Sequence, residues 1–192
     1  MIRKSNRKYV VIAIVCGVLL FTGAAFTLQS NNQSFGKLWA RDTKEVWLGE
    51  MNIPLVTAAG AVTGHVRLSE TDRGIQVNVQ ASGLKPGKHG FHLHEKKFEN
   101  NDFKTAGAHY NPEHKKHGHL NPEGPHQGDY LNLNAGADGT AHMSFVIEGM
   151  TLEKGKANSI QGKSFIVHAD EDDYKTDPSG NSGDRIAGGN VG

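Results

Sequence analysis

Apolar and polar residues alternate in short segments along most of the chain from residue 45 onward. In "GIQVNVQA", residues 74–81, the side chains of Ile75, Val77 and Val79 share one face and the polar ones share the other. This period of two predicts a strand with one buried face. Similar segments, with turn signals such as "TDRG" and "ADG" between them, lie at 61–68, 141–149, 163–169 and 185–192. Their spacing predicts around eight strands in an all-β sandwich or barrel.

Two long stretches without a strand pattern interrupt these segments, at roughly 95–129 and 169–184. The first contains "HYNPEHKKHGHLNPEGPHQGD", in which three prolines forbid a regular helix or strand. Long loops inside a compact domain usually carry function. We therefore expect the active or binding groups in these two stretches.

The first 28 residues differ from the rest because a basic flank precedes the uncharged apolar run Val10–Leu28. This order is typical of an export signal, and the run is also close to the ~20 residues that span a bilayer. The sequence leaves two alternatives open, a cleaved signal peptide or a retained membrane anchor, and disfavours a buried core helix. We expect residues 29–44 to form a polar linker and residues 45–192 an exported, extracytoplasmic domain that meets the membrane only through residues 1–28.

Charge and cysteine content limit what this domain can do. The chain has 21 Lys and Arg and 20 Asp and Glu, and four of the basic residues lie in residues 1–28, so the remainder carries 17 basic against 20 acidic residues, a net charge of −3. This balance argues against nucleic-acid binding. The single cysteine, Cys16, lies in the apolar run, and Val15 before it disfavours lipid attachment. The domain can form no disulfide, so any metal must be bound by histidines and carboxylates.

His92 and His94 lie two residues apart in "GFHLHE". On a strand their side chains project from the same face, where two imidazoles can bind one metal ion. The alternative is a pair of ordinary surface histidines. His168, which ends the apolar segment "SFIVHA", adds a distant third imidazole, and one loop histidine would complete a four-nitrogen set of the kind that favours Cu²⁺.

The loop supplies a second candidate set. His109, His117 and His126 follow one another at spacings of eight and nine residues, and Asp129 comes three residues later. Three imidazoles and one carboxylate form a complete tetrahedral set for Zn²⁺, which would then order the loop. The alternative is a loose metal-scavenging loop. We expect that two further histidines in it, His114 and His119, bind no metal.

At these residues the chain resembles the copper–zinc superoxide dismutase family. The similar motifs are "GFHLHE", "AGAHYNPEHKKHGHLNPEGPHQGD", "GKSFIVHADEDDY" and "SGNSGDRIAGG", and they extend over residues 45–192. The resemblance implies an eight-stranded Greek-key sandwich or barrel that holds one copper and one zinc ion per subunit. The implied copper ligands are His92, His94, His109 and His168, and the implied zinc ligands are His109, His117, His126 and Asp129. His109 would then be shared between the two metals.

The resemblance also implies the reaction, in which superoxide is converted to O₂ and H₂O₂. Asp172 would join one ligand histidine of each metal, and Arg185 would guide and hold the substrate anion. His109 would release copper and take up a proton during the cycle. A homodimer is possible, although no self-complementary surface can be recognised in the sequence.

The chain departs from this family in two respects. The family's disulfide would fall at Phe103 and Gly188, so we expect weaker anchoring of residues 95–108 and of Arg185, and a loop over 95–129 that depends on zinc. Asp184 precedes Arg185 and could weaken the local positive potential, with Lys175 as a possible compensating charge. These departures favour one alternative function, a catalytically weak or inactive metal-binding relative. A zinc hydrolase is disfavoured because a closed His₃Asp set leaves no open coordination position.

Overall fold

The protein is all-β in the part that its computed structural model describes, residues 35–38 and 46–192. The strands are β1 Phe35–Leu38, β2 Val46–Thr57, β3 Val62–Thr71, β4 Gly74–Ala81, β5 Gly87–His89, β6 Phe91–His94, β7 Leu133–Ala135, β8 Ala141–Glu148, β9 Ser164–His168 and β10 Arg185–Asn190. One 3₁₀ turn, η1 Phe103–Ala106, is the only helical element among these residues. The prediction of an all-β fold from alternating segments is confirmed, and β4 has the predicted bounds.

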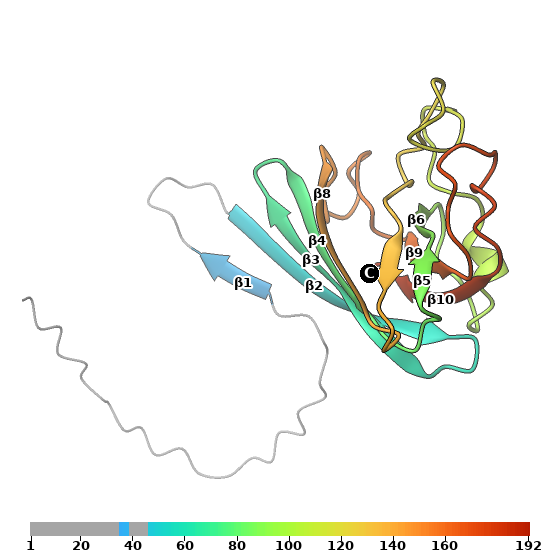
Figure 1. Cartoon of the computed structure of the whole chain (residues 1–192). Helices are drawn as coiled ribbons and strands as arrows, with labels where there is room; N and C mark the ends of the chain where they lie inside the picture. The colour runs from blue at the N-terminus through green and yellow to red at the C-terminus, as the bar shows by residue number, and fades with distance from the viewer. Residues whose placement is uncertain (1–34, 39–45) are drawn as a thin grey trace, which may run out of the picture. The chain divides into compact units, whose positions relative to one another are not determined.

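Eight of the strands form one curled sheet in the order β6-β9-β10-β2-β3-β4-β8, with β1 paired to β2 outside this path (Figure 1). β5 and β7 form a separate two-stranded sheet. The chain passes from β4 to β6, and again from β8 to β9, between opposite ends of the large sheet. These long crossings are Greek-key connections. The structure has ten strands where the sequence predicted around eight, and β1 and the short β5–β7 pair are among those that were not apparent in the sequence.

The sheet curls around the main apolar core. In β4, Ile75, Val77 and Val79 are buried as the alternation predicted, whereas Asn78 and Gln80 are exposed. These side chains belong to the same buried cluster as Phe91 of β6 and Phe165 of β9, whose rings stack at 5.4 Å between centroids. Residues from both halves of the sheet therefore fill the space that it encloses. Because its side chains are closely packed, the core gives the two long loops a rigid support.

Both predicted loops are present beside the β6, β9 and β10 strands (Figure 1). Residues 95–132 connect β6 to β7 and contain η1, and residues 169–184 connect β9 to β10. The loops therefore start at the ends of two neighbouring, hydrogen-bonded strands, β6 and β9. The histidines of β6 and the last residue of β9 consequently lie next to the loop residues that fold back over these two strands.

The expected signal peptide or anchor, residues 1–28, lies outside the described residues. Strand β1 lies within 29–44, the range expected to be a polar linker, and pairs with the first residues of β2. In the described part of the chain, no helix has the length and apolar character needed to cross a bilayer.

Candidate metal centre

The first long loop returns twice to strand β6. The amide of Leu93 donates to the carbonyl of Gly128 at 2.9 Å, and the amide of Tyr110 donates to the carbonyl of Leu93 at 2.8 Å. A Cβ atom on Gly128 would lie 2.2 Å from the Leu93 oxygen, so only glycine permits this approach. The two contacts place His109 and Asp129, the neighbours of Tyr110 and Gly128, directly beside His94 and His92.

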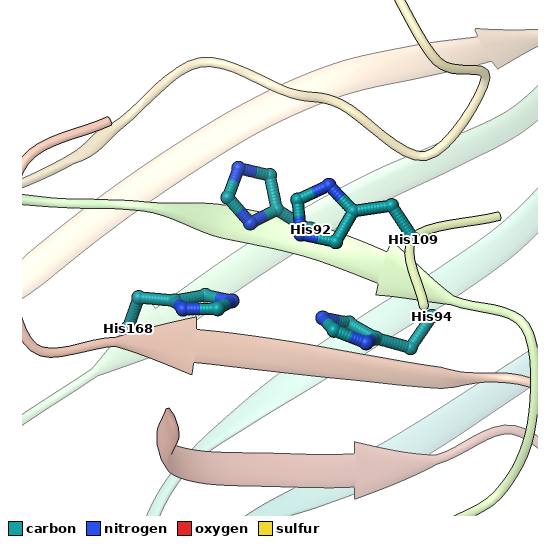
Figure 2. Close-up of side chains that lie close together, drawn as sticks. All are labelled: His92, His94, His109 and His168. Atoms are coloured by element: carbon teal, nitrogen blue, oxygen red, sulfur yellow. The ribbon is translucent and has the colours of Figure 1, made fainter. Parts of the chain in front are cut away.

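Four histidines, from two strands and one loop, meet at this place. Their rings face a common space (Figure 2), and one nitrogen of each lies within 4.8 Å of one nitrogen of every other. We call this group, His92, His94, His109 and His168, the four-histidine set. All four side chains are buried, with at most 6% of any residue exposed. The structure thus brings together the residues for which the sequence predicted a copper site.

The protein fixes three of these rings through one nitrogen each. His92 Nε2 donates to Asp172 Oδ2 at 2.9 Å, and His94 Nδ1 donates to the carbonyl of Gly107 at 3.0 Å. His168 Nδ1 lies 3.3 Å from the carbonyl of Gly183, to which it donates. Because carbonyl and carboxylate oxygens only accept, each bonded nitrogen carries the proton. The other nitrogen of each ring is therefore an unprotonated acceptor.

The unprotonated nitrogens of these three rings, and one nitrogen of His109, have no hydrogen-bond partner within the protein. His92 Nδ1, His94 Nε2, His109 Nε2 and His168 Nε2 are buried and make no hydrogen bond. An unsatisfied buried polar atom costs about 1–3 kcal/mol, and a native protein rarely places several together without a reason. Four lone pairs that converge on one space form a donor set for a cation, and four imidazoles suit copper. The residues present therefore fit a copper ion.

A second set shares His109 with the first. One ligand atom of each of His109, His117, His126 and Asp129 lies within 4.8 Å of the others, and all four side chains are buried. We call it the His₃Asp set. His109 Nδ1 lies 2.9 Å and His126 Nδ1 3.2 Å from Asp129 Oδ1. His117 Nδ1 lies 3.1 Å from Oδ2 but outside hydrogen-bond geometry. Three imidazole nitrogens and a carboxylate fit a zinc ion.

Asp172 connects the two sets. Its Oδ2 accepts from His92 Nε2 and its Oδ1 accepts from His117 Nε2, both at 2.9 Å. The side chain is fully buried, and its own backbone is held by Asn132, which accepts from the Asp172 amide and donates to the Asp172 carbonyl at 2.9 Å each. Carboxylates in this position fix the tautomer and orientation of ligand histidines. Asp172 thus contacts one histidine of each set.

Burial keeps the four-histidine set neutral. It lowers the pKa of His92, lowers that of His94 well below its usual value, and lowers the pKa of His109 to about 4 despite the hydrogen bond to Asp129. The pKa of His168 falls to about 2, chiefly through burial. Neutral imidazole is the form that binds metals, so these rings are ready to coordinate at neutral pH.

The His₃Asp set attracts positive charge instead. Burial alone would lower the pKa of His117, but Asp129 on one side of the ring and Asp172 on the other raise it to about 9. Burial would likewise raise the pKa of Asp129, but hydrogen bonds from His109 and the other surrounding groups hold it well below its usual range. Two buried carboxylates around one ring therefore stabilise a cation there, whether a proton or a metal ion.

A cavity of about 750 Å³ reaches these sets from the surface. Arg185, His109 and His168 are among its lining residues, so the guanidinium lies at the approach to the four-histidine set. Arg185 donates from Nη1 to the Phe103 carbonyl at 2.6 Å and from Nη2 to the Gly107 carbonyl at 2.8 Å. The Gly107 oxygen therefore joins Arg185 to His94.

The charges around the cavity differ in part from those expected. Lys175, the suggested compensating charge, and Asp184 are exposed and are not among the described residues that line the cavity. Lys115 and Lys116 line it instead, and each is paired with a carboxylate, Lys116 with Asp177 at 3.0 Å.

Sequence reasoning missed the groups that support the ligands. Asn132 and the carbonyls of Gly107 and Gly183 carry no sequence signal, because their role depends on contacts across 13 to 40 positions of the chain. The Lys116–Asp177 pair joins the two loops and was equally invisible. His114 and His119 belong to neither set, although His119 Nε2 lies 3.1 Å from the Asp129 carbonyl oxygen.

Comparison with known proteins gives consistent matches. Residues 62–191 match the sequence pattern of the family described as copper/zinc superoxide dismutase. The chain is 42% identical over 142 residues to superoxide dismutase [Cu-Zn] 1 of Aquifex aeolicus, covering 71% of this chain and 84% of that protein. It is 40% identical over 144 residues to the superoxide dismutase-like protein YojM of Bacillus subtilis, covering 72% and 74%.

The fold is similar to solved structures as well. The crystal structure of a SOD-like protein from Bacillus subtilis superposes with a TM-score of 0.68 at 35% identity, covering 82% of this chain and 99% of that one.

Proposed function

This chain belongs to the copper/zinc superoxide dismutase family, and we propose that it converts superoxide to O₂ and H₂O₂ at a copper–zinc site bridged by His109. Copper and zinc are its cofactors. The proposed copper ligands are the four-histidine set and the proposed zinc ligands are the His₃Asp set. The single observation that carries the proposal is the convergence of four buried, unpartnered ring nitrogens, one of them on a histidine that belongs to both sets.

Bound copper would supply the one-electron chemistry by which one superoxide leaves as O₂ and a second, with two protons, leaves as H₂O₂. Zinc has no redox chemistry and would be held by His117, His126 and Asp129 on the Nδ1 side of His109. The remaining steps belong to the protein, which must attract the anion, hold it beside the four-histidine set and deliver protons.

Arg185 attracts and holds the anion. Its guanidinium stays charged at all physiological pH values, and two of its N–H groups are used by the carbonyls of Phe103 and Gly107. The remaining N–H groups can bind superoxide at the cavity wall. Because the domain as a whole is mildly acidic, this attraction has to be local.

His109 provides the proton. Its Nδ1 faces Asp129, and its Nε2 is the unpartnered atom that faces the other three histidines. Nε2 is therefore the atom at which His109 would hold a proton and donate it to the reduced oxygen product. Asp172 keeps His92 and His117 in one orientation throughout, so the other ligands do not have to rearrange.

A specific observation favours a second candidate, a catalytically weak or inactive metal-binding relative. One similar protein is named only superoxide dismutase-like, and this chain has no cysteines at the family's disulfide positions. Metal analysis combined with a dismutation assay separates the two. Protein loaded with copper and zinc should hold one of each per chain and remove superoxide far faster than the zinc-only form. Zinc retention with activity no higher than buffer would favour the second candidate.

We propose further that residues 1–28 direct export and that the domain over 45–192 acts outside the cytoplasm. The support is the basic flank before an apolar run with no acidic residue. Cell fractionation of the full chain, with mass determination of its mature N-terminus, should find the domain outside the cytoplasm and tell a cleaved signal from a retained anchor. Recovery of the full-length chain in the cytoplasmic fraction would contradict export.

A further inference from the structure

A small aromatic cluster lies beside the main core, between the first loop and strand β10. Phe98 and Phe103 meet edge to face, with 4.9 Å between ring centroids and 81° between ring planes. Together with Ala106 and Ile166 they form a buried group separate from the main core. Phe103 is only 4% exposed although it lies in a loop. Burial of this extent in a loop indicates that the ring anchors the loop to the sheet.

The surface on which the rings pack is the bare backbone of Gly188 in β10. A Cβ atom built there would lie 2.8 Å from Ile166 Cδ1, 2.9 Å from Phe98 Cε1 and 3.1 Å from Phe103 Cε1. Distances below 3.0 Å do not occur for real Cβ atoms, so any side chain at 188 must displace these groups. The absence of a side chain at Gly188 is therefore what allows the rings to approach the strand.

The same loop and strand are joined again at Arg185, three residues before Gly188. The backbone carbonyl of Phe103 accepts from Arg185 Nη1 at 2.6 Å, and the carbonyl of Gly107, just after η1, accepts from Nη2 at 2.8 Å. Phe103 thus contacts β10 in two ways. Its ring packs on Gly188, and its carbonyl accepts a hydrogen bond from the guanidinium of Arg185. A displacement of the Phe103 ring moves the turn that presents both acceptor oxygens.

Asn190, two residues after Gly188, completes the attachment. Its side chain accepts from the Phe98 amide and donates to the Phe98 carbonyl, each at 3.0 Å. Arg185, Gly188 and Asn190 therefore contact one loop segment, residues 98–107, from three places along a single strand. We call this group of contacts the β10 clasp. It contains no covalent bond.

We propose that Phe103 is the positioning residue for Arg185: its ring, packed on Gly188, places the carbonyls that orient the guanidinium toward the anion. The β10 clasp lies at the two positions where the resemblance implied a disulfide. The orientation of Arg185 consequently depends on packing and is independent of thiol oxidation. The expected effect on catalysis rests on the proposed function, whereas the expected effect on the orientation of Arg185 does not.

The test measures anion binding as well as activity. Azide, a small monovalent anion, is titrated into copper- and zinc-loaded protein while the optical spectrum of the copper is followed. Phe103→Ala should weaken azide binding and lower kcat/KM by about tenfold, because small misplacements of a positioning group are costly. Phe103→Leu, which keeps an apolar side chain on Gly188, should recover most of the loss. Gly188→Ala should act in the same direction as Phe103→Ala.

Two comparisons separate positioning from loss of stability. Phe145→Ala removes a partly buried ring from the main core, where it contacts Tyr130 at 4.6 Å between centroids, and should leave azide affinity unchanged. In an Arg185→Lys background, Phe103→Ala should weaken azide binding by less than about twofold, because the group it positions is already gone. If Phe103→Ala does not fold, the azide affinities of Phe103→Leu and Gly188→Ala test the proposal in its place.

Unchanged azide affinity in Phe103→Ala, or equal losses in the Arg185 and Arg185→Lys backgrounds, would overturn the inference. Failure of the proposed function is recognised separately. Wild-type protein without dismutation activity would refute the enzyme, while hydrogen exchange of residues 103–107 and azide affinity would still report on the β10 clasp.

Discussion

Asp172 supports the proposed ligands of both metals although it belongs to neither the four-histidine set nor the His₃Asp set. It is buried between the two sets and accepts one hydrogen bond from each. Without the carboxylate, His92 and His117 would lose the acceptor that fixes which nitrogen carries the proton. Both rings could then rotate or change tautomer, and the lone pairs offered to the metals would no longer converge.

We therefore predict that Asp172→Asn weakens metal binding about 10- to 100-fold, the range typical for groups that support ligand histidines. Competition titrations with a chelator, for copper and for zinc, measure the change. Asp173→Asn is the matched control, because its exposed carboxylate bonds only to groups of its own loop. Equal metal affinities in Asp172→Asn and wild type would show that Asp172 does not support the ligand histidines.

Arg185 provides the second prediction at this scale. Arg185→Ala removes the charge at the cavity wall and should lower kcat/KM by about tenfold or more, with a weaker dependence on salt. Arg185→Lys keeps the charge but loses the planar guanidinium, so its kcat/KM should lie between those of wild type and Arg185→Ala. Lys175→Ala, an exposed lysine away from the cavity lining, should leave the rate unchanged. The assignment of Arg185 fails if Arg185→Ala matches wild type.

At the level of elements, the first long loop divides into two parts that are held differently. Residues 96–107 are attached to β9 and β10 by side-chain hydrogen bonds and by the aromatic cluster. Residues 109–129 contain all four members of the His₃Asp set, whose mutual contacts favour a bound cation. The expectation that the whole stretch 95–129 depends on zinc stays a prediction, and the structure makes it more specific.

Hydrogen exchange with and without zinc can test this division. Zinc should slow exchange of amides in residues 109–129 strongly, and those in 96–107 much less, because the β10 clasp does not involve the metal. Exchange in β4, which is hydrogen-bonded to β3 on one side and to β8 on the other, serves as the internal control. Equal protection of residues 109–129 in both forms would show that zinc does not order this loop.

The elements that the sequence predicted well are those with a local signal. β4 was recognised because Ile75, Val77 and Val79 alternate with polar residues, and the β3–β4 turn because "TDRG" separates two such segments. β5 and β7 have three residues each and pair across more than 40 positions, so no local pattern reveals them. The histidines were recognisable as metal ligands, but the carbonyl of Gly107 was not, because every residue has a carbonyl.

For the whole molecule, the buried histidines make the stability of the metal-free protein depend on pH. The pKa of His109 is lowered to about 4, and the pKa values of His92, His94 and His168 are lowered as well. The unfolded chain binds more protons at these sites, so the free energy of unfolding falls as the pH drops below about 6.5. His117 acts oppositely, because its pKa is raised to about 9 and its contribution is lost as the pH rises toward that value.

We predict that the unfolding free energy of the metal-free protein is highest near neutral pH. It should decline by about 1.4 kcal/mol per pH unit for each histidine involved on the acid side, and more gently toward pH 9. Urea titrations between pH 4.5 and 9 measure this profile. A free energy that stays constant or rises from pH 6.5 to 4.5 would contradict the assignment of buried, neutral imidazoles.

We propose above that one imidazole, that of His109, bonds to two different metal ions. Anomalous diffraction from crystals of the metal-loaded protein, recorded at the copper and zinc absorption edges, measures it most directly. We expect copper at Nε2 and zinc at Nδ1 of the same ring, with the zinc about 2.1 Å from its nitrogen. A single ion, or two ions of which only one contacts His109, would contradict it.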